Sequence, residues 1–137
     1  IMDSGATVPV MSPSTGRHYK GTESEASKAG VMYACVNGDT IPNLGEKAMP
    51  VVTQEGTVRG YFSQMADVTT PLQSVRHLYK SGHLVVFDGP ESFMYNKNTG
   101  EVNAIEDDGF NYVQELWVIP PDELHNVNSV DFTRQRP

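Results

Sequence analysis

Glycine and proline recur along the whole chain, and this spacing is the feature that most restricts its fold. The 137 residues include 12 Gly and 9 Pro, and both residue types disfavour the interior of a helix. The segments between them are short, and several alternate apolar and polar side chains as half-buried strands do. The sequence therefore predicts an all-β fold of many short strands, with room for one short helix.

Three hairpins are expected where two such segments flank a short polar turn that contains glycine. They join residues 31–36 to 39–41, residues 48–52 to 57–65, and residues 93–96 to 101–105. The second arm of the middle hairpin alternates regularly, which predicts that one face of that arm is buried. Single strands are expected at 84–87 and 112–119.

The best helix candidate covers residues 71–82, and Gly82 suits the position after its last turn. Four apolar residues share one face of this helix: Leu72, Val75, Leu78 and Tyr79. A single helical turn is also expected at 24–28, inside a polar surface connection that runs from 13 to 29.

The charge pattern restricts the partners. The net charge is −7, whereas binding to nucleic acid draws on clustered Lys and Arg, and the one basic cluster, 134–136, lies at the end of the chain. No stretch approaches the ~18 consecutive apolar residues of a membrane span, and no signal-peptide pattern opens the chain. We therefore expect an intracellular, cytoplasmic domain that binds neither nucleic acid nor membrane.

No residue set in the sequence suggests a metal or a cofactor. Cys35 is the single cysteine, and the four histidines lack the i,i+4 or Cys–His spacing of a zinc site. The Asp-Gly pairs at 88–89 and 108–109 do not fit a calcium-binding loop and are interpreted as turns. A serine triad is disfavoured because no Gly-x-Ser-x-Gly motif is present.

Asp3-Ser4-Gly5-Ala6 is the motif that could carry chemistry. Peptide hydrolysis by paired carboxylates needs one to activate a water as a base and the other to donate a proton to the carbonyl oxygen. Glycine lets backbone N–H groups approach such a carboxylate without a Cβ clash. On its own, however, this tetrapeptide is also typical of an ordinary Asx turn.

Further landmarks follow the tetrapeptide in a specific order. They are the segment 36–41 with Gly45, the segment 66–78 with Leu72 and Ser74-Val75, the segment 81–87, and the segment 98–102. With these landmarks the chain resembles the copia-type retrotransposon proteases, a retropepsin-like family, over residues 1 to about 118.

The resemblance implies a small closed retropepsin-like barrel with one short helix and a C-terminal β-hairpin extension. The protease domain would cover residues 1–119, with its N-terminal strand truncated, and residues 120–137 would form a polar tail or linker.

The resemblance also implies an aspartic endopeptidase protomer of a retroelement polyprotein. Asp3, Ser4 and Gly5 would form the catalytic loop, and a second Asp3 would come from the other chain of a homodimer, because the motif occurs once. A polypeptide substrate would lie extended between this loop and a flap, without any cofactor. The implied substrate-binding residues are Ala6, Asn37, Gly38, Asp39, Thr40, Val68, Thr69, Thr70 and Pro71.

Two alternatives stay open at the level of sequence. The domain could be domesticated, catalytically inert and used as a structural or binding subunit of a larger assembly. It could also be an unrelated β-barrel binding module in which Asp-Ser-Gly-Ala occurs by chance. Two Asp3 side chains meeting across a dimer would exclude the second alternative.

Overall fold

The computed structural model describes residues 1–35 and 37–126. These residues are mostly strands with few and short helices, which confirms the predicted all-β character. Residues 127–137 of the predicted tail lie outside the described residues. The division at residue 119 stays a prediction.

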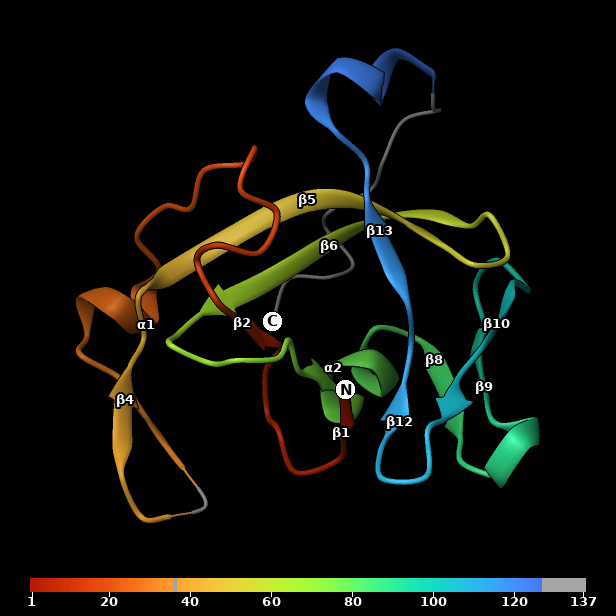
Figure 1. Ribbon diagram of the computed structural model, residues 1–137, viewed down its shortest axis with the longest axis horizontal. Helices are drawn as coiled ribbons and strands as arrows, with labels where there is room; N and C mark the ends of the chain where they lie inside the picture. The colour runs from red at the N-terminus through yellow and green to blue at the C-terminus, as the bar shows by residue number, and fades with distance from the viewer. Residues whose placement is uncertain (36, 127–137) are drawn as a thin grey trace.

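A long antiparallel hairpin dominates the architecture. Its strands β5 (Gly45–Thr53) and β6 (Val58–Met65) arch over the central helix and the smaller sheets (Figure 1). β13 (Leu116–Val118) pairs antiparallel with β5, and β2 (Val10–Met11) pairs parallel with β6. The resulting sheet, in the order β13-β5-β6-β2, curls as a half-barrel, and a closed retropepsin barrel stays a prediction.

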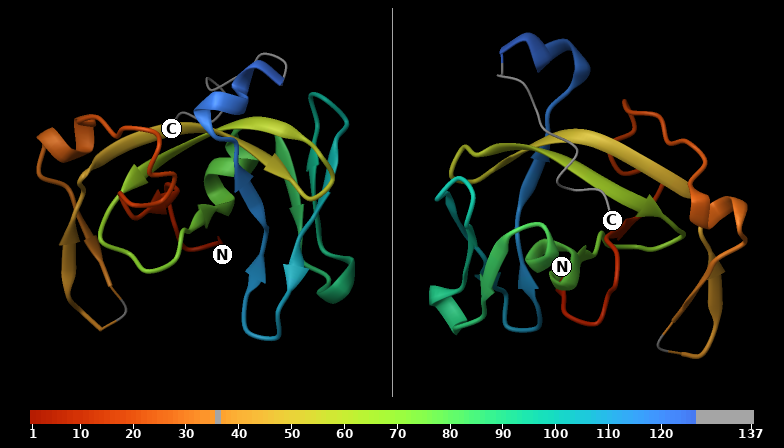
Figure 2. Two further views of the ribbon diagram at one scale, coloured as in Figure 1. Left: turned by 45° about the horizontal axis from the view of Figure 1, so that its top comes forward. Right: turned by 180° about the vertical axis from the view of Figure 1, so that it is seen from behind.

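Smaller sheets lie below the two ends of this arch (Figure 2). At one end lies the hairpin of β3 (Met32–Ala34) and β4 (Thr40–Pro42). The other end carries one three-stranded and one two-stranded sheet. Their strands are β8 (His83–Val86), β9 (Phe93–Asn96) and β10 (Val102–Ala104), then β11 (Glu106–Asp107) and β12 (Tyr112–Val113).

Beneath the arch, the N-terminal strand meets the helix. β1 (Met2–Asp3) pairs parallel with β7 (Gln73–Ser74), which leads directly into α2 (Val75–Lys80). The remaining helices are single turns or short 3₁₀ segments: α1 (Glu25–Lys28), η1 (Gly89–Glu91) and η2 (Pro121–Asn126).

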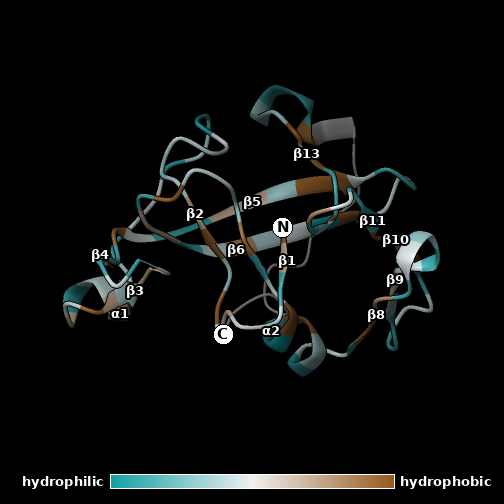
Figure 3. Ribbon diagram, turned by 60° about the horizontal axis from the view of Figure 1, so that its bottom comes forward, coloured by the Kyte–Doolittle hydropathy of each residue, from teal (hydrophilic) through white to brown (hydrophobic). Residues whose placement is uncertain are grey.

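Two apolar clusters hold these layers together. One joins β1, α2 and the three-stranded sheet through Met2, Leu78, Met94 and Ile105. The other lies under the arch and consists of Met11, Met49, Val51 and Tyr61. Figure 3 shows the corresponding hydrophobic stretches on β2 and β5. Burial of these side chains is the main stabilising term for a sheet of this size.

All three expected hairpins are present, but the prediction that one face of the middle hairpin's second arm is buried was too narrow. Residues 60–65 of β6 are buried on both faces. The polar side chains within this buried stretch, Ser63 and Gln64, are hydrogen bonded rather than solvated. Ser63, for example, donates through Oγ to the Gln64 carbonyl oxygen at 2.9 Å.

The predicted helix 71–82 is shorter in the structure. Gln73 and Ser74 are held in a strand by Met2 and Asp3, so α2 begins only at Val75. The predicted apolar face was also wrong at its end, since Tyr79 is 59% exposed while His77 is buried. Strand pairing therefore overrides the helical pattern before residue 75.

The predicted strand 112–119 is interrupted at Gln114 and Glu115. Its first part pairs with β11 and its second part with β5. The two halves belong to different sheets, and the two residues between them make the transition.

Candidate active site

The Asp3 turn is built by strand pairing and by one backbone hydrogen bond. Asp3 lies opposite Ser74 in the β1–β7 pair, and the Gly5 N–H donates to Asp3 Oδ1 at 2.8 Å. A Cβ on Gly5 would approach the same oxygen to 3.3 Å. Glycine at this position therefore lets the backbone close tightly around the carboxylate.

Ser74 connects this turn to the helix. Its Oγ donates to the Ala6 carbonyl oxygen at 2.6 Å and accepts from the His77 N–H at 3.0 Å, as the N-cap of α2. Ser74 is only 1% exposed. One buried hydroxyl thus fixes both the helix start and the residue that follows Asp-Ser-Gly.

A cavity of about 350 Å³ opens beside Asp3. Its walls come from three places: the Asp3 turn and the residues after it, the β3–β4 hairpin, and the segment before β7. The lining residues are Asp3, Gly5, Ala6, Thr7, Val8, Val10, Tyr33, Ala34, Cys35, Ile41, Val68 and Leu72. The arrangement places one carboxylate at the edge of a largely apolar cleft.

The hairpin over this cleft is anchored by a buried amide. Asn43 is 6% exposed, and its Nδ2 donates to the Tyr33 hydroxyl at 2.8 Å and to Gln64 Oε1 at 2.9 Å. Its Oδ1 accepts from Ser24 Oγ at 3.0 Å and from the Gly45 N–H at 2.8 Å. Asn43 therefore ties the base of the hairpin to β6, to the cap of α1 and to the start of β5.

Four of the predicted site residues line the cleft: Asp3, Gly5, Ala6 and Val68. The other predicted residues do not. Ser4 and Thr69 are exposed outside it, and Thr70 and Pro71 line a different cavity. Residues 37–40 form the exposed hairpin tip, where the Asp39 N–H donates to Asn37 Oδ1 at 3.0 Å.

The structure adds cleft residues that the sequence reasoning missed. They are Thr7, Val8, Val10, Tyr33, Ala34, Cys35, Ile41 and Leu72. The signal was available for the hairpin, because Tyr33 pairs with Ile41 and cross-strand partners share a face. The arms of the hairpin line the cleft, whereas its tip, residues 37–40, lies outside it.

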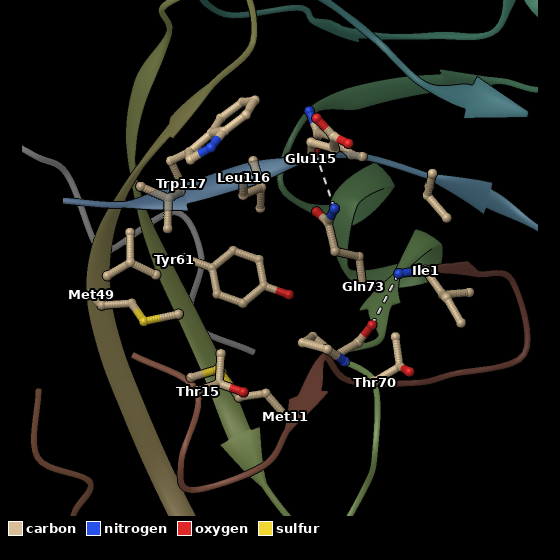
Figure 4. Close-up of a pocket in the computed structure, with 15 residues that line it drawn as sticks. Ile1, Met11, Thr15, Met49, Tyr61, Thr70, Gln73, Glu115, Leu116 and Trp117 are labelled. Atoms are coloured by element: carbon tan, nitrogen blue, oxygen red, sulfur yellow. Dashed lines mark hydrogen bonds between the residues drawn. The ribbon is translucent and has the colours of Figure 1, made fainter. Parts of the chain in front are cut away.

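A second cavity, of about 530 Å³, lies under the arch (Figure 4). Met49 and Val51 of β5 and Tyr61 of β6 form its apolar wall on the side of the arch. Gln73 and Gln114 add amide groups to the lining. Burial raises the pKa of Tyr61 to about 12, although the charge of Arg59 acts in the opposite direction.

No protein-family model matches this chain, and neither does any curated protein or any solved structure. Within residues 1–35 and 37–126, no group of three or more His, Cys, Asp or Glu side chains is arranged to hold a metal ion. No helix in the described part of the chain has the length and apolar character needed to cross a membrane.

Proposed function

We propose that this chain is one protomer of a retropepsin-like aspartic endopeptidase, in which two Asp3 carboxylates meet across a homodimer. The observation that carries the proposal is the position of Asp3, on a glycine turn braced by Ser74 and at the edge of an apolar cleft. A protomer with one such carboxylate holds half of the required pair.

The proposed reaction is the addition of water to a peptide carbonyl. One Asp3 carboxylate takes a proton from the water, and the protonated Asp3 of the second chain donates to the carbonyl oxygen. The Gly5 N–H keeps the carboxylate oriented through its 2.8 Å hydrogen bond. Collapse of the tetrahedral intermediate then returns a proton to the leaving amine.

The substrate in this proposal is an extended polypeptide. Its backbone would lie along the cleft between the Asp3 turn and the β3–β4 hairpin, as an added strand does. Val8, Ile41 and Leu72 would receive an apolar side chain. By its resemblance to copia-type proteases, the natural substrate would be the polyprotein of a retroelement.

The substitution Asp3→Asn tests the proposal. The amide keeps the shape of the side chain but cannot act as a base, so cleavage of a peptide library should fall by about 100-fold or more. Asp67→Asn, at an exposed position before the Val68 wall, is the matched control and should cleave as the wild type does. Wild-type cleavage rates in Asp3→Asn, with an unchanged melting temperature, would contradict the assignment.

A folded, dimeric wild type that cleaves nothing in the library would instead support the inert structural domain. If Asp3→Asn loses cleavage but still forms the dimer, the loss reflects missing catalysis and not a loss of folding.

A further inference from the structure

Arg59 carries a buried positive charge that its contacts in the described part of the chain compensate only in part. Its guanidinium is buried, and its Nε and Nη1 have no hydrogen-bond partner. Only Nη2 is engaged, donating to Gln73 Oε1 at 3.0 Å and to Gln114 Oε1 at 3.2 Å. The ring of Tyr61 lies 5.8 Å from the guanidinium carbon, and no carboxylate in residues 1–35 or 37–126 is paired with it.

A guanidinium stays charged in proteins, so burial cannot be relieved by loss of its proton. Desolvation of such a charge is unfavourable unless an anion or a full set of acceptors compensates it. Two neutral amide oxygens and one aromatic face supply only part of that compensation. The site is therefore suited to receive an anion.

The 530 Å³ cavity described above lies next to this cation. Arg59 is on the same face of β6 as Tyr61, and its cross-strand partner Val51 also lines the cavity. Gln73 and Gln114 both accept hydrogen bonds from the guanidinium and both line the cavity; Figure 4 shows Gln73 at the cavity wall. A cavity of this volume falls within the ~300–1,000 Å³ range of sites for small organic ligands.

Gln114 is the less constrained of the two amides. It lies in the two-residue link between β12 and β13, where no strand pairing holds it. Its Nε2 has no partner, and its Oε1 accepts from Arg59 and, at 3.0 Å, from Gln73 Nε2. A carboxylate in place of that oxygen would accept the same two hydrogen bonds and add a charge opposite to that of Arg59.

We propose that this cavity binds a small organic acid with an apolar body. The carboxylate replaces the Gln114 amide beside Arg59, and the apolar body packs against Met49, Leu116 and Trp117. The site is distinct from the cleft at Asp3, because Pro71 and Gln73 line this cavity while Leu72 between them lines the cleft. A single strand segment separates the two.

The single tryptophan of the chain, Trp117, lines the cavity and is 50% exposed, so its fluorescence reports occupancy without any assay of cleavage. The probe is 4-phenylbutyrate, and its neutral counterpart is 4-phenylbutyramide. We expect the acid to bind about tenfold more tightly than the amide, as a charge-assisted contact to a buried cation implies.

Two variants locate the contact. Arg59→Met should abolish the preference for the acid, and Gln114→Ala should tighten binding of the acid because the competing amide is gone. Equal binding of acid and amide to the wild type, or an acid preference that survives in folded Arg59→Met, would overturn the proposal. If Arg59→Met does not fold, Gln114→Ala decides, since acid binding that is weakened by this change contradicts the displacement of Gln114.

Discussion

At the scale of single residues, Ser74 links the candidate chemistry to the stability of the fold. Its hydroxyl both caps α2 and holds the Ala6 carbonyl. Most N-caps satisfy only local backbone groups, whereas this one also satisfies a carbonyl 68 positions away. The loss of one oxygen atom should therefore disturb the helix and the Asp3 turn together.

Ser74→Ala should lower the free energy of unfolding by about 2 kcal/mol, because a cap and a buried hydrogen bond are both lost. Ser81→Ala is the control at the other end of α2, where Oγ donates to the Leu78 carbonyl oxygen at 3.0 Å and lies 3.3 Å from His83 Nδ1, and it should cost about 1 kcal/mol or less. Urea unfolding of both variants measures the difference. Equal losses would show that the contact with Ala6 contributes nothing.

Tyr61 gives a second prediction at this scale. Its pKa in the folded protein is about 12, above the value of ~10 expected in the unfolded chain. The unfolded state therefore loses this proton first as the pH rises. The stabilisation from protonated Tyr61 is fully present below pH ~10 and is lost as the pH rises toward 12.

The measurement is the free energy of unfolding from pH 8 to 11.5. Tyr61→Phe, which has no proton to lose, should show a shallower decline than the wild type. Tyr79→Phe, at an exposed position, should follow the wild-type curve. Parallel curves for all three proteins would contradict the proposed role of Tyr61.

At the scale of elements, Gly45 marks the corner between the β3–β4 hairpin and the arch. It has a φ of +119°, and a Cβ there would overlap the Thr22 carbonyl oxygen. Gly56, in the turn between β5 and β6, has a φ of +87° but open space around it. A side chain at Gly56 would meet backbone strain alone, whereas a side chain at Gly45 would meet both backbone strain and steric overlap. Comparing the two positions therefore isolates the effect of the overlap.

Gly56→Ala should cost about 1–2 kcal/mol from the left-handed backbone alone. Gly45→Ala should cost at least about 1 kcal/mol more, because the overlap with Thr22 forces a backbone shift. Thermal unfolding of the two variants tests the order. A smaller loss at Gly45 than at Gly56 would mean that the corner adjusts freely.

Local patterns predicted those elements whose partners are close in sequence. The hairpins over 31–41, 48–65 and 93–105 follow from alternation and from glycine turns, and all three are present. The elements that were missed depend on distant partners. β7 exists because Met2 pairs with Gln73, and no local property of residues 71–74 distinguishes that strand from the first turn of a helix.

The candidate site shows the same division. The Asp-Ser-Gly-Ala motif and the order of the segments predicted four residues that line the cleft: Asp3, Gly5, Ala6 and Val68. Tyr33 and Leu72 were not predicted. Tyr33 could have been inferred from its cross-strand pairing with Ile41, whereas Leu72 reaches the cleft beside Val10 through a bridge that only the folded chain forms.

At the scale of the whole molecule, the proposed activity depends on concentration. A protomer with one Asp3 has half of the proposed catalytic pair, so dimerisation and activity are linked by mass action. Specific activity should fall on dilution toward the monomer, with the midpoint at the dissociation constant measured by analytical ultracentrifugation. Constant specific activity in a verified monomer would refute the composite site.

The parallel pairing of β1 with β7 has a consequence for how the protein is made. Asp3 is among the first of these residues to leave the ribosome, but its turn is completed by Ser74. Contacts with such a large sequence separation form slowly and cannot form on a short nascent chain. The Asp3 turn of a growing chain therefore stays unassembled until Ser74, past the midpoint of the 137 residues, has emerged, so the proposed peptidase should be inactive until that point of synthesis.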